Sequence, residues 1–535
     1  MTVRRIMGIE TEYGISHPDN PEATSEAMSR EIISAYTRAT SKLGHTDDVA
    51  WDLAGEMPML DTRHPTISRE HIASRNNIHQ VASLTAQERS WQRGTTKVLH
   101  NGARFYVDHS HPEYASPECL GPRQTVMYDR AGELVMQRAM AQLQEVTGTS
   151  PAIYKNNVDG KGSSYGCHEN YLVDRAVPFD DIVAALIPFL VTRPILVGAG
   201  RVGLGQASEE AGYQMSQRAD YIESIIGPNT TYDRPIVNTR DEPHAEPHLH
   251  RRLHVISGDA NCVPSNTLLK LGMTSLLLWV LETNGLPDEW KALELKDPVA
   301  AVKVVSRDLS LSQELELADG NRMTALDIQS TYQRTVDACL IEYHNGRSPD
   351  VETSDILYRW RDMIGLLADD WRQTVGDIEW ATKLALLEAR RSRDGLDWDA
   401  PELMAMDLQW SDVRKEKSLP DKLTERGILE TMEADSWIEH AEFTPPAGTR
   451  AWFRGELIRR FPGQIYSASW HSIVVELDGG KLIRIPMTSP DAGSAMHLED
   501  KLNACQSVEE VLDLVGGTGQ NILADPDVYA KVGAR

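Results

Sequence analysis

The 535-residue chain has few cysteines, a shortage of positive charge and no long hydrophobic run. Its five cysteines are scattered and form no CxxC pair, which disfavours a disulfide scaffold or a cysteine-bound zinc ion and indicates a reducing cytoplasm. The 54 basic and 79 acidic residues give a net charge of −25. Because phosphate binding needs a basic surface, this charge excludes a globally basic nucleic-acid binder.

The sequence predicts neither a membrane segment nor a secretory signal. The most apolar stretch, Leu268 to Leu281, is interrupted by Lys270 and Thr274 and is shorter than the roughly 20 residues that a membrane span needs. The first residues, MTVRRIMGIETEYG, carry a basic pair without the apolar segment of a signal peptide. With 41% hydrophobic and 25% charged residues, the chain is predicted to be globular and cytoplasmic.

The chain divides into regions of different texture. Short apolar runs alternate with turn signals up to about residue 263, which is typical of strands with interspersed helices. Residues 265–393 show helical periodicity, and the most apolar stretch is expected to be a buried helix. Residues 44–99 contain a long polar stretch with weak periodicity, which predicts an insertion over the surface that could act as a lid.

A second domain is predicted near the C-terminus. We place a catalytic domain at residues 1–439 and a small α+β domain at 440–535. Within the small domain, residues 451–461, 465–477 and 481–487 are predicted strands, and the tail after residue 500 is a predicted helix. In the predicted catalytic domain, the run PILVGAG, which begins at residue 194, is also a predicted strand.

The segment IMGIETEYG carries two neighbouring carboxylates on one face of a predicted strand. Because side chains alternate along a strand, Glu10 and Glu12 share a face, and Ile9 and Thr11 point the other way. Two carboxylates this close repel each other unless a cation lies between them, and Mg²⁺ is the natural choice. A solvated polar face on an edge strand is the alternative.

The segment NGARFYVDHSHPEYASPE has a similar pattern. Alternation puts three polar side chains on one face: Arg104, Tyr106 and Asp108. The carboxylates of Glu113 and Glu118 follow. This set fits a nucleotide phosphate held by arginine, a metal held by carboxylates, and one carboxylate left for chemistry. A surface strand with unrelated charges is the alternative.

Other polar segments give weaker indications. After a flexible turn, His168 and Asn170 share one face of a predicted strand. DGKGS lacks the P-loop frame, and the GxGxxG spacing after residue 197 lacks a clean amphipathic helix, which favours a flexible turn over a dinucleotide site. The histidines between residues 244 and 254 are interrupted by proline, which disfavours zinc.

Taken together, these segments resemble the enzymes that handle Pup, the prokaryotic ubiquitin-like protein. The resemblance rests on GIETEYG, NGARFYVDHSHPEYASPE, YKNNVDGKGSSYGCHENYL, GRVGLG, NTRDEPHA and RRLHVISGDAN. Both branches of that family, the Pup ligase and the Pup deamidase that is also the depupylase, resemble glutamine synthetase. The resemblance implies an α+β fold with a curved antiparallel β-sheet cradle, flanking helices and a small C-terminal α+β domain. It also implies bound ATP and Mg²⁺.

Two features of the resemblance favour the deamidase and depupylase branch. The ligase has a short connection where this chain runs from about residue 44 to 99, and DHSHPEYASPE is closer to the deamidase form. The resemblance then implies hydrolysis of the C-terminal glutamine amide of Pup and of the isopeptide bond between Pup and a substrate lysine. A Pup ligase, a small-molecule carboxylate–amine ligase and a non-catalytic Pup-binding protein are the alternatives.

The resemblance also assigns roles to individual residues. It makes Asp108 the catalytic aspartate, acting as nucleophile or as general base, with ATP bound but not consumed. The implied metal positions are Glu10, Glu12, Tyr106 and Glu113. The implied nucleotide contacts are Arg104, Ser116 and Trp470, and three further residues line the same cradle: His168, Arg240 and His254. Pup and pupylated proteins are the implied partners, with a link to the bacterial proteasome.

Pup is acidic and largely disordered, so long-range electrostatics would oppose its encounter with a chain of charge −25. We therefore expect a local basic groove that leads to Asp108. Its expected members are Arg218, Arg234, Arg240, Arg251 and Arg252.

Overall fold

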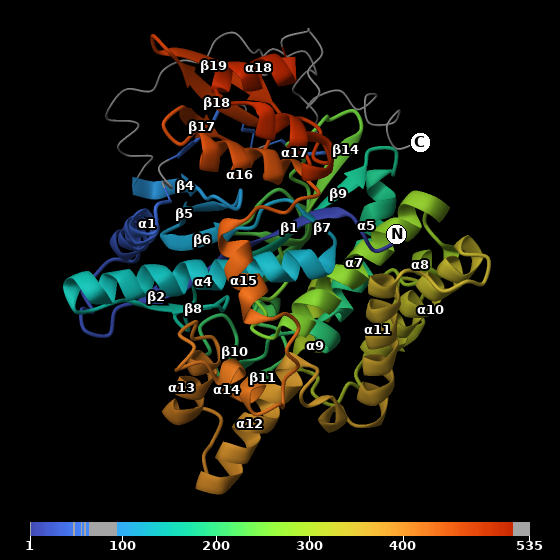
Figure 1. Cartoon of the computed structure of the whole chain (residues 1–535). Helices are drawn as coiled ribbons and strands as arrows, with labels where there is room; N and C mark the ends of the chain where they lie inside the picture. Colours follow the sequence, from blue (N-terminus) through green and yellow to red (C-terminus); the bar gives the residue numbers. More distant parts are fainter. Residues whose placement is uncertain (1, 46–48, 55, 58–59, 64–93, 517–535) are drawn as a thin grey trace.

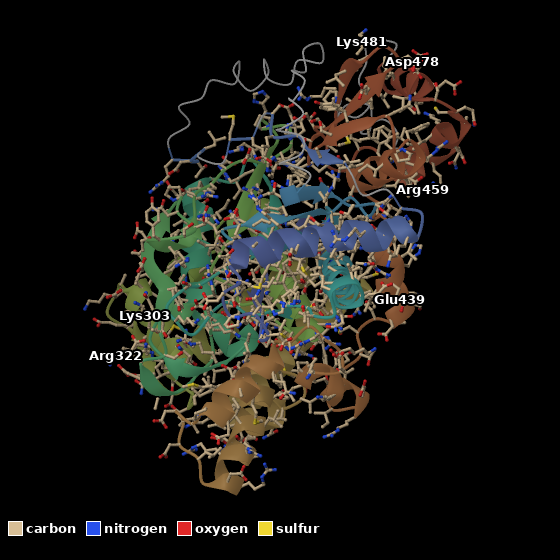
Figure 2. The ribbon with its side chains drawn as sticks, turned by 90° about the vertical axis from the view of Figure 1, so that its left-hand side faces the viewer. Lys303, Arg322, Glu439, Arg459, Asp478 and Lys481 are labelled. Carbon is tan, nitrogen blue, oxygen red and sulfur yellow. The ribbon has the colours of Figure 1, made fainter. Side chains whose placement is uncertain are left out.

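A computed structural model describes residues 2–45, 49–54, 56–57, 60–63 and 94–516 of the chain (Figure 1). Helices flank a large antiparallel sheet, so the predicted α+β class is confirmed. In the side view of Figure 2, charged side chains such as Arg322 and Asp478 project from the periphery. Among the described residues, no helix combines the length and apolar character that crossing a membrane requires.

The central sheet has seven strands in the order β14-β9-β1-β6-β5-β4, with β7 paired to β1. Neighbouring strands are antiparallel throughout. The strands are β1 (Ile6–Glu12), β4 (Thr96–Val98), β5 (Arg104–Asp108), β6 (His111–Ala115), β7 (Cys119–Leu120), β9 (Cys167–Asp174) and β14 (His250–Val255). The chain positions of β1, β9 and β14 are far apart, so this sheet assembles side chains from distant segments.

Two long helices, α1 (Ser25–Lys42) and α4 (Pro122–Thr147), pack against each other and cover the apolar side of β5 and β6. Phe105 is fully buried there, as the alternation in β5 predicts. The helix approaches the sheet closely at Gly132, where an added Cβ would lie 2.4 Å from the ring of Tyr114. Glycine is therefore required for this packing.

The second half of the chain is mainly helical, as predicted. The helix α7 (Pro264–Asn284) contains the apolar stretch and is buried over most of its length. Other helices of the larger region are α5 (Phe179–Thr192), α8 (Asp288–Lys291), α9 (Pro298–Arg307), α10 (Ala325–Tyr343), α11 (Val351–Asp369), α12 (Glu379–Asp394), α13 (Pro401–Trp410) and α14 (Leu419–Glu425), and α7 packs against α5, α10 and α11. Four two-stranded ribbons accompany them: β2 (Gly14–Ser16) with β8 (Ala152–Tyr154), β10 (Arg201–Leu204) with β11 (Glu210–Gln214), β12 (Ile222–Gly227) with β13 (Arg234–Asn238), and β15 (Glu314–Glu316) with β16 (Arg322–Thr324).

Two strand predictions are wrong. The run PILVGAG begins with a short helix, α6 (Pro194–Val197), because proline is well suited to the first turn. Residues 451–461 lie largely in helix α16 (Arg450–Arg460), where Phe453 and Leu457, four residues apart, both face the C-terminal core. Short apolar runs do not by themselves separate a strand from a buried helix.

The C-terminal region forms a four-stranded sheet in the order β19-β18-β17-β3. Its elements are β17 (Ile465–Ala468), β18 (Ser472–Leu477), β19 (Lys481–Pro486), α17 (Ala495–Ala504) and α18 (Val508–Gly516). The edge strand β3 (Ala50–Trp51) comes from the predicted insertion and pairs in parallel with β17. Residues 64–93 of that insertion lie outside the described residues, so the lid stays a prediction. The helix α15 (Asp435–Phe443) packs on α4 and crosses the predicted domain boundary, which also stays a prediction.

Candidate functional site

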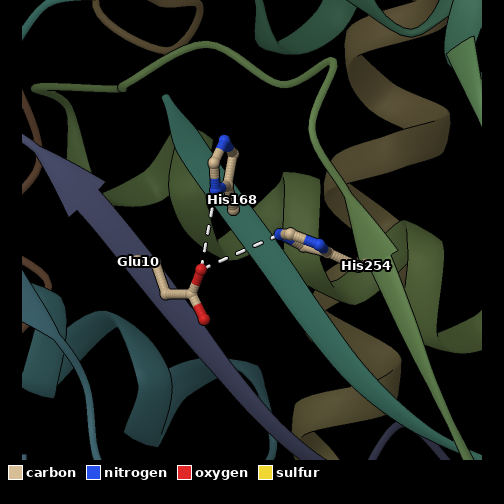
Figure 3. A group of neighbouring side chains, drawn as sticks. All are labelled: Glu10, His168 and His254. Atoms are coloured by element: carbon tan, nitrogen blue, oxygen red, sulfur yellow. Dashed lines mark ion pairs between the residues drawn. The ribbon is translucent and has the colours of Figure 1, made fainter. Parts of the chain in front are cut away.

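Three neighbouring strands bring Glu10, His168 and His254 together (Figure 3). Glu10 on β1 lies opposite His168 on β9, and His254 comes from β14 on the far side of β9. The Glu10 Oε2 atom is 3.5 Å from His168 Nδ1 and 3.8 Å from His254 Nε2. We call these residues the Glu10 group. The structure therefore joins one predicted metal residue to two residues predicted to line the same cradle.

The electrostatics of the Glu10 group fit a cation. Burial and the positive charge of Arg252 lower the pKa of His254 well below its ordinary value, so the ring is neutral. Both of its ring nitrogens are buried without a hydrogen-bond partner in the described part of the chain. Burial alone would raise the pKa of Glu10, but the hydrogen bond with His168 and the charge of Arg252 lower it. An ionised carboxylate thus lies 3.8 Å from an imidazole nitrogen that has no hydrogen-bond partner among the described residues.

A second cluster, the Glu12 group, consists of Glu12, Asp108 and Glu113. Glu12 on β1 pairs with Glu113 on β6, and one carboxylate oxygen from each of the three residues lies within 4.8 Å of the others. Burial and the negative charges of Asp108 and Glu12 raise the pKa of Glu113 well above its ordinary value. A cation would relieve this repulsion.

The donor atoms of the two groups differ. The Glu12 group offers only oxygen, which suits Mg²⁺. The Glu10 group adds two imidazoles, which suit a divalent ion that accepts nitrogen ligands. The Tyr106 phenol, also predicted as a metal residue, hydrogen-bonds to Glu113. Burial beside Glu113 raises the pKa of Tyr106 well above its ordinary value, so the phenol is protonated.

Asp108 is the most accessible member of the Glu12 group, with 37% of its side chain exposed. It ends β5 at a two-residue turn to β6, in which His109 and Ser110 have positive φ values of 43° and 74°. Non-glycine residues rarely adopt this conformation, and such strain is concentrated at functional sites. The Ser29 hydroxyl on α1 donates to the Ser110 carbonyl at 2.9 Å, and His109 Nδ1 lies 2.8 Å from Asp108 Oδ2.

Arg104 is held between two aromatic rings. Its guanidinium carbon lies 4.0 Å from the ring centre of Tyr106 and 4.3 Å from that of Trp51. The Trp51 ring contacts Trp470 edge-on at 5.0 Å between centres. Sequence reasoning missed Trp51, because a lone tryptophan in a polar segment gives no local signal of a partner on β5.

A small cavity of about 90 Å³ adjoins the Glu10 group, and four predicted or neighbouring residues line it: Glu10, Ser116, Arg252 and Trp470. The Ser116 hydroxyl accepts a hydrogen bond from the Ile9 amide at 3.0 Å, which fixes it against β1. The predicted nucleotide residues Ser116 and Trp470 therefore lie on the same side of the carboxylates.

A larger cavity of about 430 Å³ is lined by several of the predicted residues, among them Asp108, Glu12, His168, Arg218 and Arg234. The expected basic groove is thus represented by two of its five arginines here, while Arg252 lies beside Glu10.

The remaining two arginines of the expected groove differ in position. Arg240 donates to the Pro228 carbonyl at 3.0 Å. Arg251 occupies the opposite face of β14, where it donates to the Val177 carbonyl and its guanidinium carbon lies 5.3 Å from the ring centre of Phe179. The inclusion of Arg251 in the groove is wrong, since neighbouring residues of a strand point to opposite faces.

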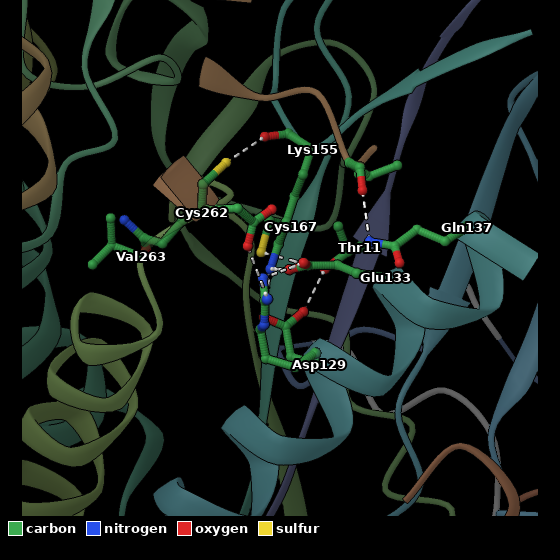
Figure 4. A network of polar contacts seen from close by, with 12 residues as sticks. Thr11, Asp129, Glu133, Gln137, Lys155, Cys167, Cys262 and Val263 are labelled. Atoms are coloured by element: carbon green, nitrogen blue, oxygen red, sulfur yellow. Dashed lines mark hydrogen bonds and ion pairs between the residues drawn. The ribbon is translucent and has the colours of Figure 1, made fainter. Parts of the chain in front are cut away.

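The reverse face of β1 carries a buried polar network that sequence reasoning did not find (Figure 4). Lys155 Nζ contacts Asp129 at 2.6 Å and Glu133 at 2.9 Å, and Thr11 lies 3.4 Å from Asp129. Thr11 is the residue between Glu10 and Glu12. This network fixes the backbone that presents the two carboxylates.

Sequence comparisons relate this chain to a known protein family and to characterised relatives. The sequence model of the family described as "Pup-ligase protein" matches residues 5–474. A protein from Mycolicibacterium smegmatis named Pup deamidase/depupylase is 43% identical, covering 96% of this chain and 99% of that protein. A depupylase from Acidothermus cellulolyticus is 42% identical, covering 96% and 100%. A Pup–protein ligase from Actinosynnema mirum is 39% identical, covering 71% of this chain and 84% of the ligase.

Two solved structures are also similar. The complex between Pup and its ligase PafA has a TM-score of 0.74 and 29% identity, covering 97% of this chain and 96% of that chain. The Pup ligase PafA in complex with ADP has a TM-score of 0.69 and 31% identity, covering 80% and 96%. These likenesses confirm the predicted fold.

Proposed function

The chain belongs to the Pup-ligase protein family, and on that basis we propose that it is a Pup deamidase and depupylase. It hydrolyses the C-terminal glutamine amide of Pup to glutamate and cleaves the isopeptide bond between Pup and a substrate lysine. The observation that carries this proposal is the half-exposed Asp108 carboxylate, which lies beside two buried carboxylates and opens into a cavity with buried arginines.

Among the curated relatives, sequence identity and sequence coverage support the hydrolase branch. The relatives named for deamidation or depupylation are 43% and 42% identical over 96% of this chain, whereas the ligase relative is 39% identical over 71%. The segment from residue 44 to 99 also contributes Trp51 to the site. Because this segment contacts Arg104, a proposed nucleotide residue, its presence supports the branch whose members carry a long connection here, the deamidase and depupylase branch.

Asp108 performs the chemical step in one of two ways. As a nucleophile, its carboxylate attacks the amide carbon, ammonia or the lysine amine leaves with a proton, and water hydrolyses the resulting anhydride. As a general base, it takes a proton from the water that attacks the same carbon. In both cases the β5–β6 turn and Ser29 hold the carboxylate at the cavity, which reduces the entropy lost on reaching the transition state.

The cofactors proposed are Mg²⁺ and ATP. Glu12 and Glu113 would hold Mg²⁺, and the Glu10 group would hold a second divalent ion. Arg104, Ser116 and Trp470 would contact the nucleotide, and the ADP complex of a related ligase supports nucleotide binding. When bound, the divalent ions supply positive charge that stabilises a developing oxyanion. ATP is not consumed, because amide hydrolysis in water is downhill.

The proposed partners are Pup and pupylated proteins, and the proposed setting is the cytoplasm of a bacterium with a proteasome. The PafA complex with Pup shows a related chain that binds Pup.

The decisive test is incubation with Pup ending in glutamine, together with Mg²⁺ and ATP. Mass spectrometry is expected to show Pup ending in glutamate, with released ammonia and no stoichiometric ADP. A pupylated test protein is expected to be released from Pup under the same conditions. Stoichiometric ADP together with new Pup–lysine bonds would instead identify a ligase.

A further inference from the structure

A second cavity, of about 640 Å³, adjoins the cavity that contains Asp108, and we call it the α13 cavity. It lies between the ribbon of β2 and β8, the strand β10 and the helix α13 (Figure 1). Its volume is within the range of ligand pockets. Among the described residues that line it, none is assigned to the metal or to the nucleotide, so the proposed cofactors do not account for this cavity.

Two residues, His111 and Tyr165, line both cavities. Their rings lie against each other, with 4.4 Å between the ring centres. His111 begins β6 and is paired with Asp108 across the β5–β6 turn. Directly paired residues of neighbouring strands lie side by side on one face of a sheet. The α13 cavity therefore begins one strand position away from the carboxylate that is proposed to react.

Tyr165 has a fixed position at this border. Its hydroxyl donates a hydrogen bond to the Asn156 side-chain oxygen, and its ring is 5% exposed. A Cβ added at Gly14 would clash with the same hydroxyl, so the chain needs glycine there. A ligand that spans the two cavities must therefore pass along the rings of Tyr165 and His111.

The side of the cavity formed by α13 is apolar and uncovered. Met404 and Leu408 are four residues apart on this helix and share one face. Both line the cavity, and each is 42% exposed. An exposed apolar wall inside a cavity next to an active site suits an apolar part of a substrate.

The charged side chains among the described lining residues are Asp159, Lys161 and Asp407. Asp407 forms an ion pair with Lys383. Asp159 accepts hydrogen bonds from the backbone amides of Lys161 at 2.7 Å and Ser163 at 3.0 Å, and no cationic side chain of the described residues lies within 4.0 Å of it. The cavity thus combines an apolar wall with a carboxylate that has no cationic partner in the described part of the chain.

We propose that the α13 cavity accepts the lysine side chain of the pupylated protein, with the isopeptide nitrogen directed past His111 and Tyr165 toward Asp108. This leaving-group site rests on the proposed function and names the part of the enzyme that contacts the modified protein. The four-carbon stem of lysine suits the apolar wall of α13, and the ammonium released by cleavage is attracted by Asp159. Acidic Pup would instead be repelled by that carboxylate.

The two proposed reactions differ only on this side of the broken bond. Deamidation releases ammonia, which needs no site for a side chain. Depupylation releases a lysine that is attached to a protein. Since Pup is common to both substrates, a change confined to the α13 cavity is expected to affect depupylation alone.

The test compares Pup ending in glutamine with Pup joined by an isopeptide bond to the lysine of a short synthetic peptide. With Mg²⁺ and ATP present, Leu408→Arg is expected to lower kcat/KM for the peptide conjugate by roughly tenfold, because it places bulk and positive charge on the apolar wall. The same variant is expected to change kcat/KM for deamidation by no more than about twofold. Asp159→Asn keeps a side-chain oxygen acceptor and is expected to lower cleavage of the conjugate by roughly threefold.

Control variants separate the lysine site from folding. Leu408→Met keeps a flexible apolar side chain and is expected to cleave the conjugate like the wild type. Ile341→Arg makes the corresponding change at a 56% exposed residue of α10, which does not line the cavity and lies on the other side of the molecule from α13 in Figure 1. It is expected to leave both reactions unchanged. Thermal unfolding of each variant reports on folding.

The outcomes distinguish the lysine site from the proposed hydrolysis. Equal losses of deamidation and depupylation in Leu408→Arg would show that the cavity serves Pup and would overturn the lysine site, as would unchanged cleavage of the conjugate. If the wild type joins Pup to the lysine peptide and hydrolyses neither substrate, the proposed function fails, and a higher KM for the peptide in Leu408→Arg would still support the site. If neither substrate reacts, calorimetry decides: tighter binding of the conjugate than of Pup alone, lost in Leu408→Arg, supports the site, and equal binding overturns it.

Discussion

Glu113 and Glu118 are two glutamates five positions apart in the same motif, yet their surroundings are opposite. Glu113 lies among carboxylates, and burial together with Asp108 and Glu12 raises its pKa well above the ordinary value. Glu118 lies between Arg450 and Arg454, which outweigh burial and lower its pKa to about 2.

The difference separates function from structure. Glu118 joins the central sheet to helix α16 of the C-terminal region, and its charge is fully compensated within the chain. Glu113 has no cationic side chain within 4.0 Å among the described residues, so its charge requires a partner from outside. Unbalanced charge in a folded protein indicates a ligand, whereas balanced charge indicates a structural contact.

The largest expected effect concerns Asp108, the exposed member of the unbalanced region. Asp108→Ala is expected to lower kcat for Pup deamidation by at least roughly 1000-fold, because the other two carboxylates of the Glu12 group are buried and are proposed to hold the metal. Unfolding temperature, measured in parallel, is expected to stay close to that of the wild type, since the side chain is partly exposed. A variant that still deamidates Pup would contradict the assignment.

Glu118→Gln is expected to lower the free energy of unfolding by about 3–5 kcal/mol, because it leaves two buried arginines without their carboxylate. Glu113→Gln is the matched change in the other region. Burial and the two neighbouring carboxylates disfavour the ionised Glu113 side chain, so this change is expected to raise the free energy of unfolding without added metal. Chemical denaturation measures both. A loss of stability in both variants would remove the distinction between the two regions.

The fall in the free energy of unfolding at acidic pH is expected to depend on Glu118. Its pKa is lowered to about 2 in the folded chain, below the ordinary 4.5. The stabilising contribution is therefore present above about pH 4.5 and is lost as the pH falls toward 2. In Glu118→Gln this part of the pH dependence is expected to disappear, as measured by denaturation between pH 2 and 5.

Mg²⁺ is expected to raise the unfolding temperature of the wild type, because it binds the folded Glu12 group and relieves repulsion there. Glu113→Gln is expected to reduce this shift, and Glu118→Gln is expected to keep it. Differential scanning fluorimetry with and without Mg²⁺ measures the shift. An unchanged shift in Glu113→Gln would place the ion elsewhere.

The smallest expected effect concerns Trp51. Trp51→Leu keeps an apolar side chain but removes the aromatic face over Arg104, and is expected to weaken ATP binding by roughly threefold to tenfold. Trp51→Phe retains an aromatic face and is expected to stay near the wild-type affinity. Calorimetric titration of ATP distinguishes the two. Equal affinities would show that Arg104 needs no support from the segment that contains Trp51.

The faces of strands were predictable because alternation is a local property. The sequence predicts that Phe105 points to the face of its strand opposite to Arg104 and Asp108. It also predicts that Glu10 and Glu12 share one face of their strand. The ion pairs of Glu118 with Arg450 and Arg454 were not predictable, because these partners are more than 330 positions away in the chain. The helix at residues 451–461 was missed for a related reason, because its apolar residues suit either element until packing decides.

By itself, the sequence determined which side chains share a strand face, because backbone geometry makes them alternate, and which charge is in excess, because composition alone sets it. Only the tertiary structure decided that Glu10 meets His168 and His254, that Trp51 covers Arg104, and that His111 and Tyr165 line two adjoining cavities. These outcomes depend on sheet register and on contacts between distant segments, and no local pattern specifies the energy of bringing such segments together.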